Sequence, residues 1–190
     1  LNQISKTESL LVDDDQRKRF YQILALNYQQ QGNLQAALQN YLRLSELRGL
    51  LELETIKGGS FVRTDRWIRS QLEILLARAS EQQRAEIDEF FSLYFAENLL
   101  NAKRDVLERF LLCCGNLPET EQARVLLIER LEQQAINAGS LNEQAALRRH
   151  LMQHLEHLRE SKNPEMAAFA TARLAQIYLG TRHAAQADAL

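Results

Sequence analysis

The chain is poor in the residues that make turns and sheets. Its 190 residues include only seven glycines and two prolines, and β-branched residues are sparse along it. Such a composition leaves little material for the turns between strands, and both prolines stand where periodic apolar runs begin. The sequence therefore predicts an all-α fold.

An excess of positive charge and a long apolar run are also missing. The net charge of −2 and the pI of about 6.1 provide no basic surface for nucleic acid or anionic lipid. No run of about 18 apolar residues is present, so we expect no membrane insertion of this segment. The chain opens with Leu1 and stops within a periodic run at Leu190. We expect it to be a piece of a longer polypeptide.

Motifs of enzymes and metal sites are absent as well. The chain has no glycine-rich phosphate loop, no HExxH and no paired nucleophile and base, so we expect no catalysis and no cofactor. Its two cysteines, Cys113 and Cys114, are adjacent, and neighbouring helical positions point about 100° apart. A disulfide between them would be strained, and they are poor ligands for one metal. We predict two reduced, buried thiols.

One stretch, residues 20–47, has the pattern of a helical hairpin. Apolar side chains follow a helical period on both sides of Gly32, which suits a helix end, and Asn33, which suits the start of the next helix. We predict helices over residues 16–31 and 34–47, with Ala25 facing Ala37 at the closest approach. The periodic positions are Tyr21, Leu24, Ala25 and Tyr28, then Leu34, Ala37, Leu38, Tyr41 and Leu44.

The hairpin resembles one tetratricopeptide repeat, whose signature spans about 34 residues. The matching residues are Tyr21, Leu24, Ala25, Tyr28, Gly32, Ala37 and Tyr41. The resemblance implies a binder of a protein or peptide, or of another domain of its own polypeptide. It also implies that the first helix lines the binding groove, at Arg19, Gln22, Leu26, Gln29 and Gln30. Because Gln22 and Leu26 replace the Lys and Asn of the family's carboxylate clamp, we do not expect a C-terminal carboxylate as ligand.

Near the C-terminus the pattern returns in part. Leu174, Ala175 and Tyr178 echo the first helix of the hairpin, Gly180 is expected to break the helix, and Ala187 takes the place of Ala37. We therefore expect antiparallel hairpins stacked as a short, irregular tetratricopeptide-like α-solenoid.

The expected organisation is a single domain over residues 1–190. A joint is expected near residues 57–63, because Gly58 and Gly59 interrupt a segment that adds a helical turn or two. Further helix starts are expected at the acidic triplet Asp13–Asp15, at Thr64 with Asp65, at Ser80, at Asn101, at Pro118, at Ser140 with Glu143, and at Asn163 with Pro164. For the triplet, a cation site is the alternative.

Two groups of side chains leave alternatives open. Arg63, Arg66 and Arg69 lie at a helix start, where cations oppose the dipole, so they are expected to pair with acids or a partner, or to form a phosphate site. Aromatic residues after Ser80 form a stripe that is either core or a ligand groove. The stripe contains Phe90, Phe91, Tyr94 and Phe95.

The histidines form the only pattern of metal-ligand type. His150, His154 and His157 are spaced i, i+4 and i+7 beside a leucine ridge. The first two are one turn apart and can share an ion, whereas the third lies about 10 Å along the axis from the first. A metal site and a solvated or partner-facing strip are the alternatives.

The whole chain also resembles, with low specificity, the helical regions of large bacterial envelope proteins that carry β-propeller repeats of the pyrroloquinoline-quinone-enzyme type. The residues behind this are RWIR at 66–69, LLARASEQQRAEID, RFLLCCGNLPETEQARVLLIERLE and ATARLAQIYL. This resemblance implies the cell envelope as location. The expected function is a non-enzymatic scaffold or spacer, and the alternative is a metal- or small-molecule-binding domain that uses the histidine strip.

Overall fold

A computed structural model describes residues 8, 10–55, 61–115, 117 and 119–187. The chain divides into two compact units, Leu1–Thr120 and Glu121–Leu190, which are described separately below. Helices make up nearly all of the described structure, which confirms the all-α prediction. No helix among these residues is both long enough and apolar enough to cross a membrane.

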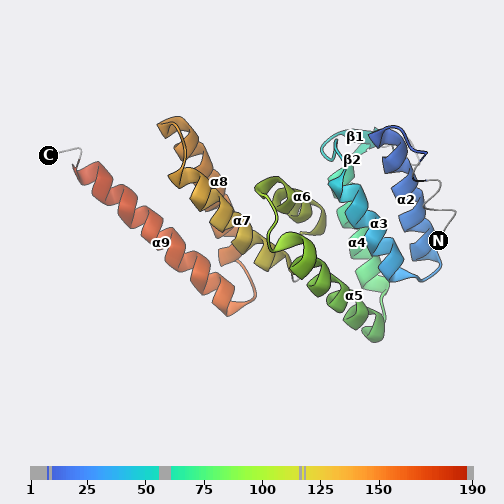
Figure 1. The fold of residues 1–190 in the computed structure, drawn as a ribbon. Helices are drawn as coiled ribbons and strands as arrows, with labels where there is room; N and C mark the ends of the chain where they lie inside the picture. The colour runs from blue at the N-terminus through green and yellow to red at the C-terminus, as the bar shows by residue number, and fades with distance from the viewer. Residues whose placement is uncertain (1–7, 9, 56–60, 116, 118, 188–190) are drawn as a thin grey trace. The chain divides into compact units, whose positions relative to one another are not determined.

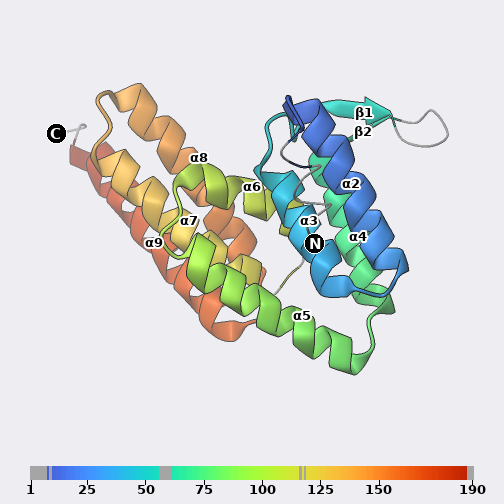
Figure 2. The same ribbon diagram turned by 45° about the vertical axis from the view of Figure 1, so that its right-hand side comes forward.

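The first unit opens with the predicted hairpin, α2 (Asp14–Gln30) and α3 (Leu34–Glu46). The two helices run antiparallel and side by side in both ribbon views (Figure 1, Figure 2). Asp13 caps α2 by accepting the backbone N–H of Gln16 at 2.8 Å, as predicted. Gly32 ends the turn with a φ of +74°, and Asn33 caps α3.

Small side chains permit the close approach of α2 and α3. Ala25 and Ala37 have no exposed surface, and the Tyr41 side chain beside them is fully buried. The Tyr41 hydroxyl donates to Gln29 Oε1 at 2.5 Å, which ties the middle of α3 to the last turn of α2. The ring of Tyr41 also meets the Trp67 ring edge-on, with centroids 5.9 Å apart.

A short ribbon follows the hairpin where helical turns were expected. β1 (Leu53–Thr55) pairs antiparallel with β2 (Phe61–Arg63), with Leu53 opposite Arg63. The helical prediction there is wrong because the two segments satisfy each other's backbone groups in a ladder. The predicted joint at Gly58 and Gly59 lies outside the described residues.

Helix α4 (Thr64–Arg78) starts at the end of this ribbon. Thr64 and Asp65 were predicted to cap this helix, but they are its first two residues instead. Both side chains are buried. The Asp65 carboxylate receives two hydrogen bonds from Arg63 instead. The Asp65 backbone N–H donates to Leu50 O at 3.1 Å, which fixes the helix start.

The rest of the first unit consists of α5 (Glu81–Tyr94), the π-helix η1 (Phe95–Leu99) and α6 (Arg104–Cys114). Ser80 and Gln83 form a reciprocal capping box that starts α5, so the predicted helix start is confirmed. Asn101 is not a cap, because the turn after η1 continues past it and α6 begins only at Arg104. Helix α4 packs mainly on α6, and α3 contacts α4, α5 and α6.

The second unit is built from α7 (Glu119–Ile136), of which the first two residues belong to the first unit, α8 (Leu141–Arg159) and α9 (Pro164–Ala187). The predicted start at Pro118 lies outside the described residues, whereas Asn163 accepts the Glu165 N–H at the predicted start of α9. Ser140 caps α8, but Glu143 bonds the Gly139 N–H rather than completing the predicted box. The core contains Leu127, Ile128, Leu131, Leu151, Leu155, Leu158 and Leu174.

The predicted break at Gly180 is absent. Helix α9 continues through Gly180 to Ala187, since a helical glycine weakens a helix by only about 1 kcal/mol. Ala175 is exposed and Tyr178 is 47% exposed, whereas Ala25 is fully buried. The expectation of half a second repeat-like hairpin after Gly180 is therefore wrong.

Candidate functional site

Two neighbouring hollows lie on the first unit, over α3, α5, η1 and α6. The larger, with a volume of about 420 Å³, is called the α3–α5 groove. The smaller, of about 190 Å³, is called the inner pocket, and both share Glu46 and Tyr94. The groove is lined by Gln39, Leu42, Arg43, Glu46, Phe90, Leu93, Tyr94 and Glu97. The inner pocket is lined by Ser45, Glu46, Tyr94, Asn98, Val106, Arg109 and Phe110.

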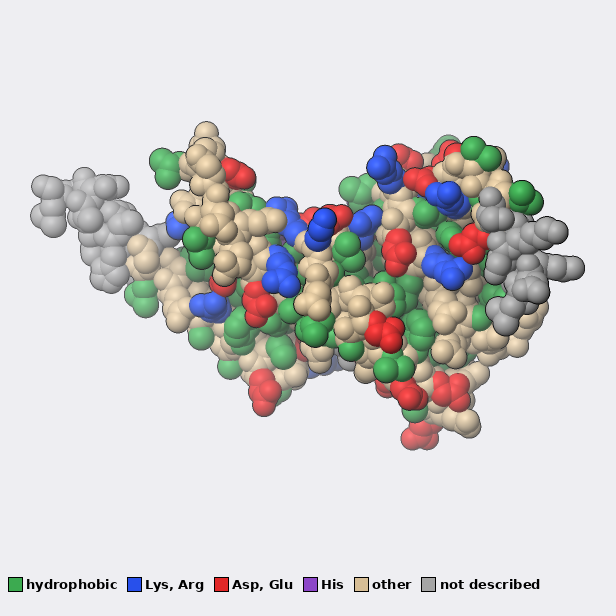
Figure 3. Space-filling model, in the orientation of Figure 1, with side chains coloured by type: hydrophobic (Ala, Val, Ile, Leu, Met, Phe, Trp, Pro, Cys, Tyr) green, Lys and Arg blue, Asp and Glu red, His purple; other side chains and the backbone are tan. Residues whose placement is uncertain are grey.

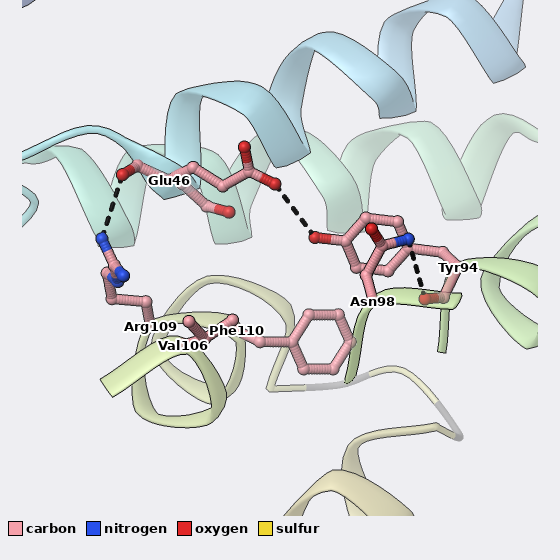
Figure 4. A pocket seen from close by; sticks show the side chains of 7 residues that line it. Glu46, Tyr94, Asn98, Val106, Arg109 and Phe110 are labelled. Atoms are coloured by element: carbon pink, nitrogen blue, oxygen red, sulfur yellow. Dashed lines mark hydrogen bonds between the residues drawn. The ribbon is translucent and has the colours of Figure 1, made fainter. Parts of the chain in front are cut away.

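Hydrogen bonds from three elements hold the walls of the inner pocket (Figure 4). The Tyr94 hydroxyl donates to Glu46 Oε1 at 3.3 Å, and Arg109 Nη1 donates to the Glu46 carbonyl oxygen at 3.0 Å. Asn98 Nδ2 donates to the Tyr94 carbonyl oxygen at 3.1 Å. The Tyr94 ring stacks on Phe110, with centroids 6.2 Å apart. The C-terminal end of α3 is thus fastened to the last residue of α5 and to α6.

Tyr94 and Asn98 share this wall because they lie four residues apart, about one helical turn, where α5 passes into the π-helix η1. A π-turn inserts an extra residue into the helical path, and such turns are frequent at functional sites. Burial, and next the charge of Glu46, raise the pKa of Tyr94 above its ordinary value. Tyr94 therefore stays protonated at neutral pH and donates, whereas the Glu46 carboxylate and the Asn98 amide oxygen accept. The pocket is suited to a group that donates hydrogen bonds.

The α3–α5 groove combines an apolar floor with a charged rim. Leu42 is buried at its base, Phe90 is half-buried, and Leu93 is 57% exposed. Arg43 on the rim reaches Glu8 at 3.4 Å and lies over the Tyr21 ring, 5.9 Å from its centroid.

Across the face shown in Figure 3, acidic and basic side chains are interspersed rather than gathered by sign. The described residues on that face form no extended basic patch, in keeping with the low net charge.

The five residues predicted from the repeat resemblance all lie on α2. Arg19 and Gln30 are exposed, whereas Gln22, Leu26 and Gln29 are partly buried. Gln29 is engaged within the hairpin, since its Oε1 accepts from Tyr41. None of the five lines the groove or the inner pocket.

The structure divides the aromatic stripe between the core and the lining of the α3–α5 groove. Phe91 belongs to the core, with 1% of its surface exposed. Phe90 and Tyr94 stack on each other, with centroids 6.4 Å apart, and line the groove. The stripe is therefore core on one side and groove wall on the other.

Two of the three arginines at the start of α4 have structural roles. Arg63 binds both oxygens of Asp65, at 3.0 and 2.7 Å, which confirms the predicted pairing with an acid. Arg69 donates to the carbonyl oxygens of Leu111 and Leu112, at 3.1 and 2.9 Å. A cation there satisfies the last turn of α6 and its dipole. Arg66 is exposed.

Cys113 and Cys114 are free and buried, as predicted. Burial raises the pKa of Cys113 to about 12 and raises that of Cys114 well above its ordinary value. Since the thiolate is the reactive form, both side chains are inert packing groups at neutral pH.

The three histidines of the strip differ in their surroundings: His150 and His154 lie close together, and His157 is exposed. Arg124 Nη1 lies 3.0 Å from His154 Nδ1, and His154 Nε2 lies 3.1 Å from His150 Nε2. Because arginine only donates, His154 Nδ1 accepts and its Nε2–H donates to His150. His157 is exposed, one turn beyond. Within the described residues, no three His, Cys, Asp or Glu side chains are placed to hold a metal.

Four residues of the inner pocket carried no signal in the sequence. Glu46, Asn98, Val106 and Arg109 come from three elements, and their meeting depends on packing between segments about 60 residues apart. Comparison with other proteins adds no identification: no protein-family model, no curated protein and no solved structure matches the chain.

Proposed function

We propose that this chain is a non-catalytic helical module that binds another protein, a peptide, or another domain of its own polypeptide. The observation that carries the proposal is the α3–α5 groove, where buried Leu42 and half-exposed Leu93 lie between two helices. Grooves of this kind accept the apolar face of an added helix.

The inner pocket has the size of a site for one side chain rather than for a whole small molecule. At about 190 Å³ it is smaller than ordinary ligand sites, which measure roughly 300–1,000 Å³. It is, however, large enough for one side chain of a partner seated in the adjoining groove. Interfaces typically concentrate their binding energy in such anchor positions.

The hairpin of α2 and α3 is proposed as one tetratricopeptide-like repeat within an irregular helical array. Its buried pair Ala25 and Ala37 and its turn at Gly32 support the resemblance. In this proposal the array is irregular because α4 packs mainly on α6 and a ribbon and a π-helix interrupt the helices. The α2 residues Arg19, Gln22, Leu26, Gln29 and Gln30 remain a second proposed contact surface.

A metal-binding function is the second candidate, because His150 Nε2 and His154 Nε2 lie 3.1 Å apart. Two nitrogens on one zinc ion lie at about this separation, given bonds of about 2.0–2.1 Å. Against it, the proton on His154 Nε2 is held there by Arg124 bonding at Nδ1. Metal analysis of chelator-free protein tests this candidate, and a stoichiometric transition metal would favour it over the scaffold.

The scaffold proposal is tested by photo-crosslinking from the groove. A photoreactive phenylalanine analogue replaces Leu93 in the groove and, as a control, Ile23 on α2, which is similarly exposed at 59%. With extract of the source cells, position 93 is expected to give a discrete adduct, identified by mass spectrometry, that position 23 does not give. The same diffuse adducts from both positions, or none, would reject the groove as a binding surface.

A further inference from the structure

We propose that the occupant of the α3–α5 groove is an amphipathic helix whose apolar face carries a flanking lysine or arginine. The inference rests on the proposed function and names the chemistry of the partner. Two observations carry it: the apolar floor of the groove and an uncompensated negative charge along its rim.

The charge of the groove follows from its ion pairs. The cation of Arg43 is directed to Glu8, at 3.4 Å, and that of Arg109 pairs with the Asp105 carboxylate, at 2.9 Å, while it also donates to the backbone carbonyl of Glu46, at 3.0 Å. Among the described residues, the Glu46 carboxylate accepts a hydrogen bond from the neutral hydroxyl of Tyr94. Within the described part of the chain, no cation pairs with the carboxylate of Glu46 or Glu97.

The inner pocket supplies a place for the basic side chain. A lysine or arginine stem can pack on the apolar surfaces of Val106 and Phe110. Its charged end then meets the Glu46 carboxylate, which accepts from the Tyr94 hydroxyl, and the amide oxygen of Asn98, a group that can only accept. An acidic helix would instead place a carboxylate beside Glu46 and Glu97, where like charges repel. Charge complementarity of this kind selects partners more than it adds affinity.

The test uses two synthetic helical peptides as probes. Both carry leucine at helix-face spacing, and they differ only in having lysine or glutamate at every flanking position. Fluorescence anisotropy measures the dissociation constant of each peptide for the whole chain. We expect the lysine peptide to bind at least tenfold more tightly than the glutamate peptide.

Substitutions then assign this preference to the groove. Glu46→Gln with Glu97→Gln should weaken binding of the lysine peptide about fivefold, since each exposed charge pair contributes little. Leu93→Ala should weaken both peptides. The matched control, Glu89→Gln with Glu129→Gln, removes two exposed carboxylates outside the groove and should leave affinity unchanged. Circular dichroism confirms that each variant is folded.

The outcomes separate this inference from the proposed function. Equal affinity for the two peptides, or an equal loss in the control variant, would overturn the basic-helix inference. If photo-crosslinking at Leu93 still gives its discrete adduct in that case, the scaffold proposal stands with a partner of another chemistry. If both experiments give no site-dependent signal, both proposals are wrong.

Discussion

At the scale of single residues, Glu119 is a carboxylic acid whose protonation the fold alters. It is 8% exposed, and its Oε2 has no hydrogen-bond partner among the described residues. Burial, and to a lesser degree the charge of Asp88, raise the pKa of Glu119. When folding raises the pKa of a carboxyl group, the protonated group stabilises the folded state at pH values below the ordinary pKa. This stabilisation is lost as the pH rises through the raised pKa. At neutral pH the ionised Glu119 carboxylate therefore destabilises the folded state.

Glu119→Gln should consequently raise the melting temperature at pH 7, by about 2 °C or more if the gain is about 1 kcal/mol. At pH 4 the wild-type acid is largely protonated, so the difference between the two proteins should shrink. Thermal unfolding followed by circular dichroism at both pH values checks this. A variant less stable at pH 7 than the wild type would show that the carboxylate has a stabilising partner.

The two adjacent thiols provide a second prediction at this scale. Because the pKa of Cys113 is about 12 and that of Cys114 is also raised, native protein at pH 8 should react slowly with a thiol reagent. Two thiols should react rapidly after denaturation. Rapid labelling of both in the native protein would contradict their burial and reopen a redox role.

Among residues, those defined by burial were the easiest to predict from the sequence. The cysteines and the alanine pair lie where an apolar period and small side chains place them. Glu46 and Arg109 were not predictable, because their contact joins positions 63 apart and depends on tertiary packing.

At the scale of elements, two glycines in different conformations offer a matched pair. Gly32 has a φ of +74°, which side chains with a Cβ rarely adopt, whereas Gly180 lies within α9 with open space around it. Gly32→Ala should destabilise the protein by about 1 kcal/mol because of backbone strain. Gly180→Ala should stabilise it by about 0.5–1 kcal/mol by favouring the helix.

Urea unfolding of both glycine variants measures these changes in free energy. Opposite signs are expected. Destabilisation by Gly180→Ala would indicate that α9 is broken there after all, as the sequence pattern first suggested.

The hairpin contact is tested by enlarging one of its small side chains. Ala37 is fully buried against α2, so Ala37→Leu should overpack the contact and cost about 1–3 kcal/mol. Leu substitution at Ala175, which is exposed on α9, serves as the control and should be nearly neutral. An unchanged denaturation midpoint for Ala37→Leu would count against the close approach of α2 and α3.

Elements that depend on local sequence signals were predicted well. Elements that depend on contacts between separate segments of the chain were not. Helix starts at Ser80 and Asn163 depend on local capping bonds that the sequence displays. The β1–β2 ribbon depends on pairing between two short segments, and the π-turn occupies Phe95–Leu99 directly after α5. Neither has a periodic signature, and a single glycine such as Gly180 is too weak a signal to end a long helix.

At the scale of the whole molecule, the scarcity of glycine, proline and β-branched residues was sufficient to predict an all-α chain. The stacking of the helices could not be predicted in this way, because helical periodicity shows that one face of a helix is buried but not which helix covers it. The division into two compact units, with α7 beginning at their boundary, likewise has no marker such as a glycine-rich linker. The groove is a product of that stacking.

The most direct test of the central claim is a map of backbone amide chemical shifts in the isotope-labelled chain, titrated with the lysine-bearing helical peptide. The account predicts saturable shifts at Leu42, Glu46, Leu93 and Glu97, and unchanged signals at Arg19 and Gln22 on α2. Shifts confined to α2, or scattered without saturation over both units, would contradict the claim that the α3–α5 groove is the binding surface.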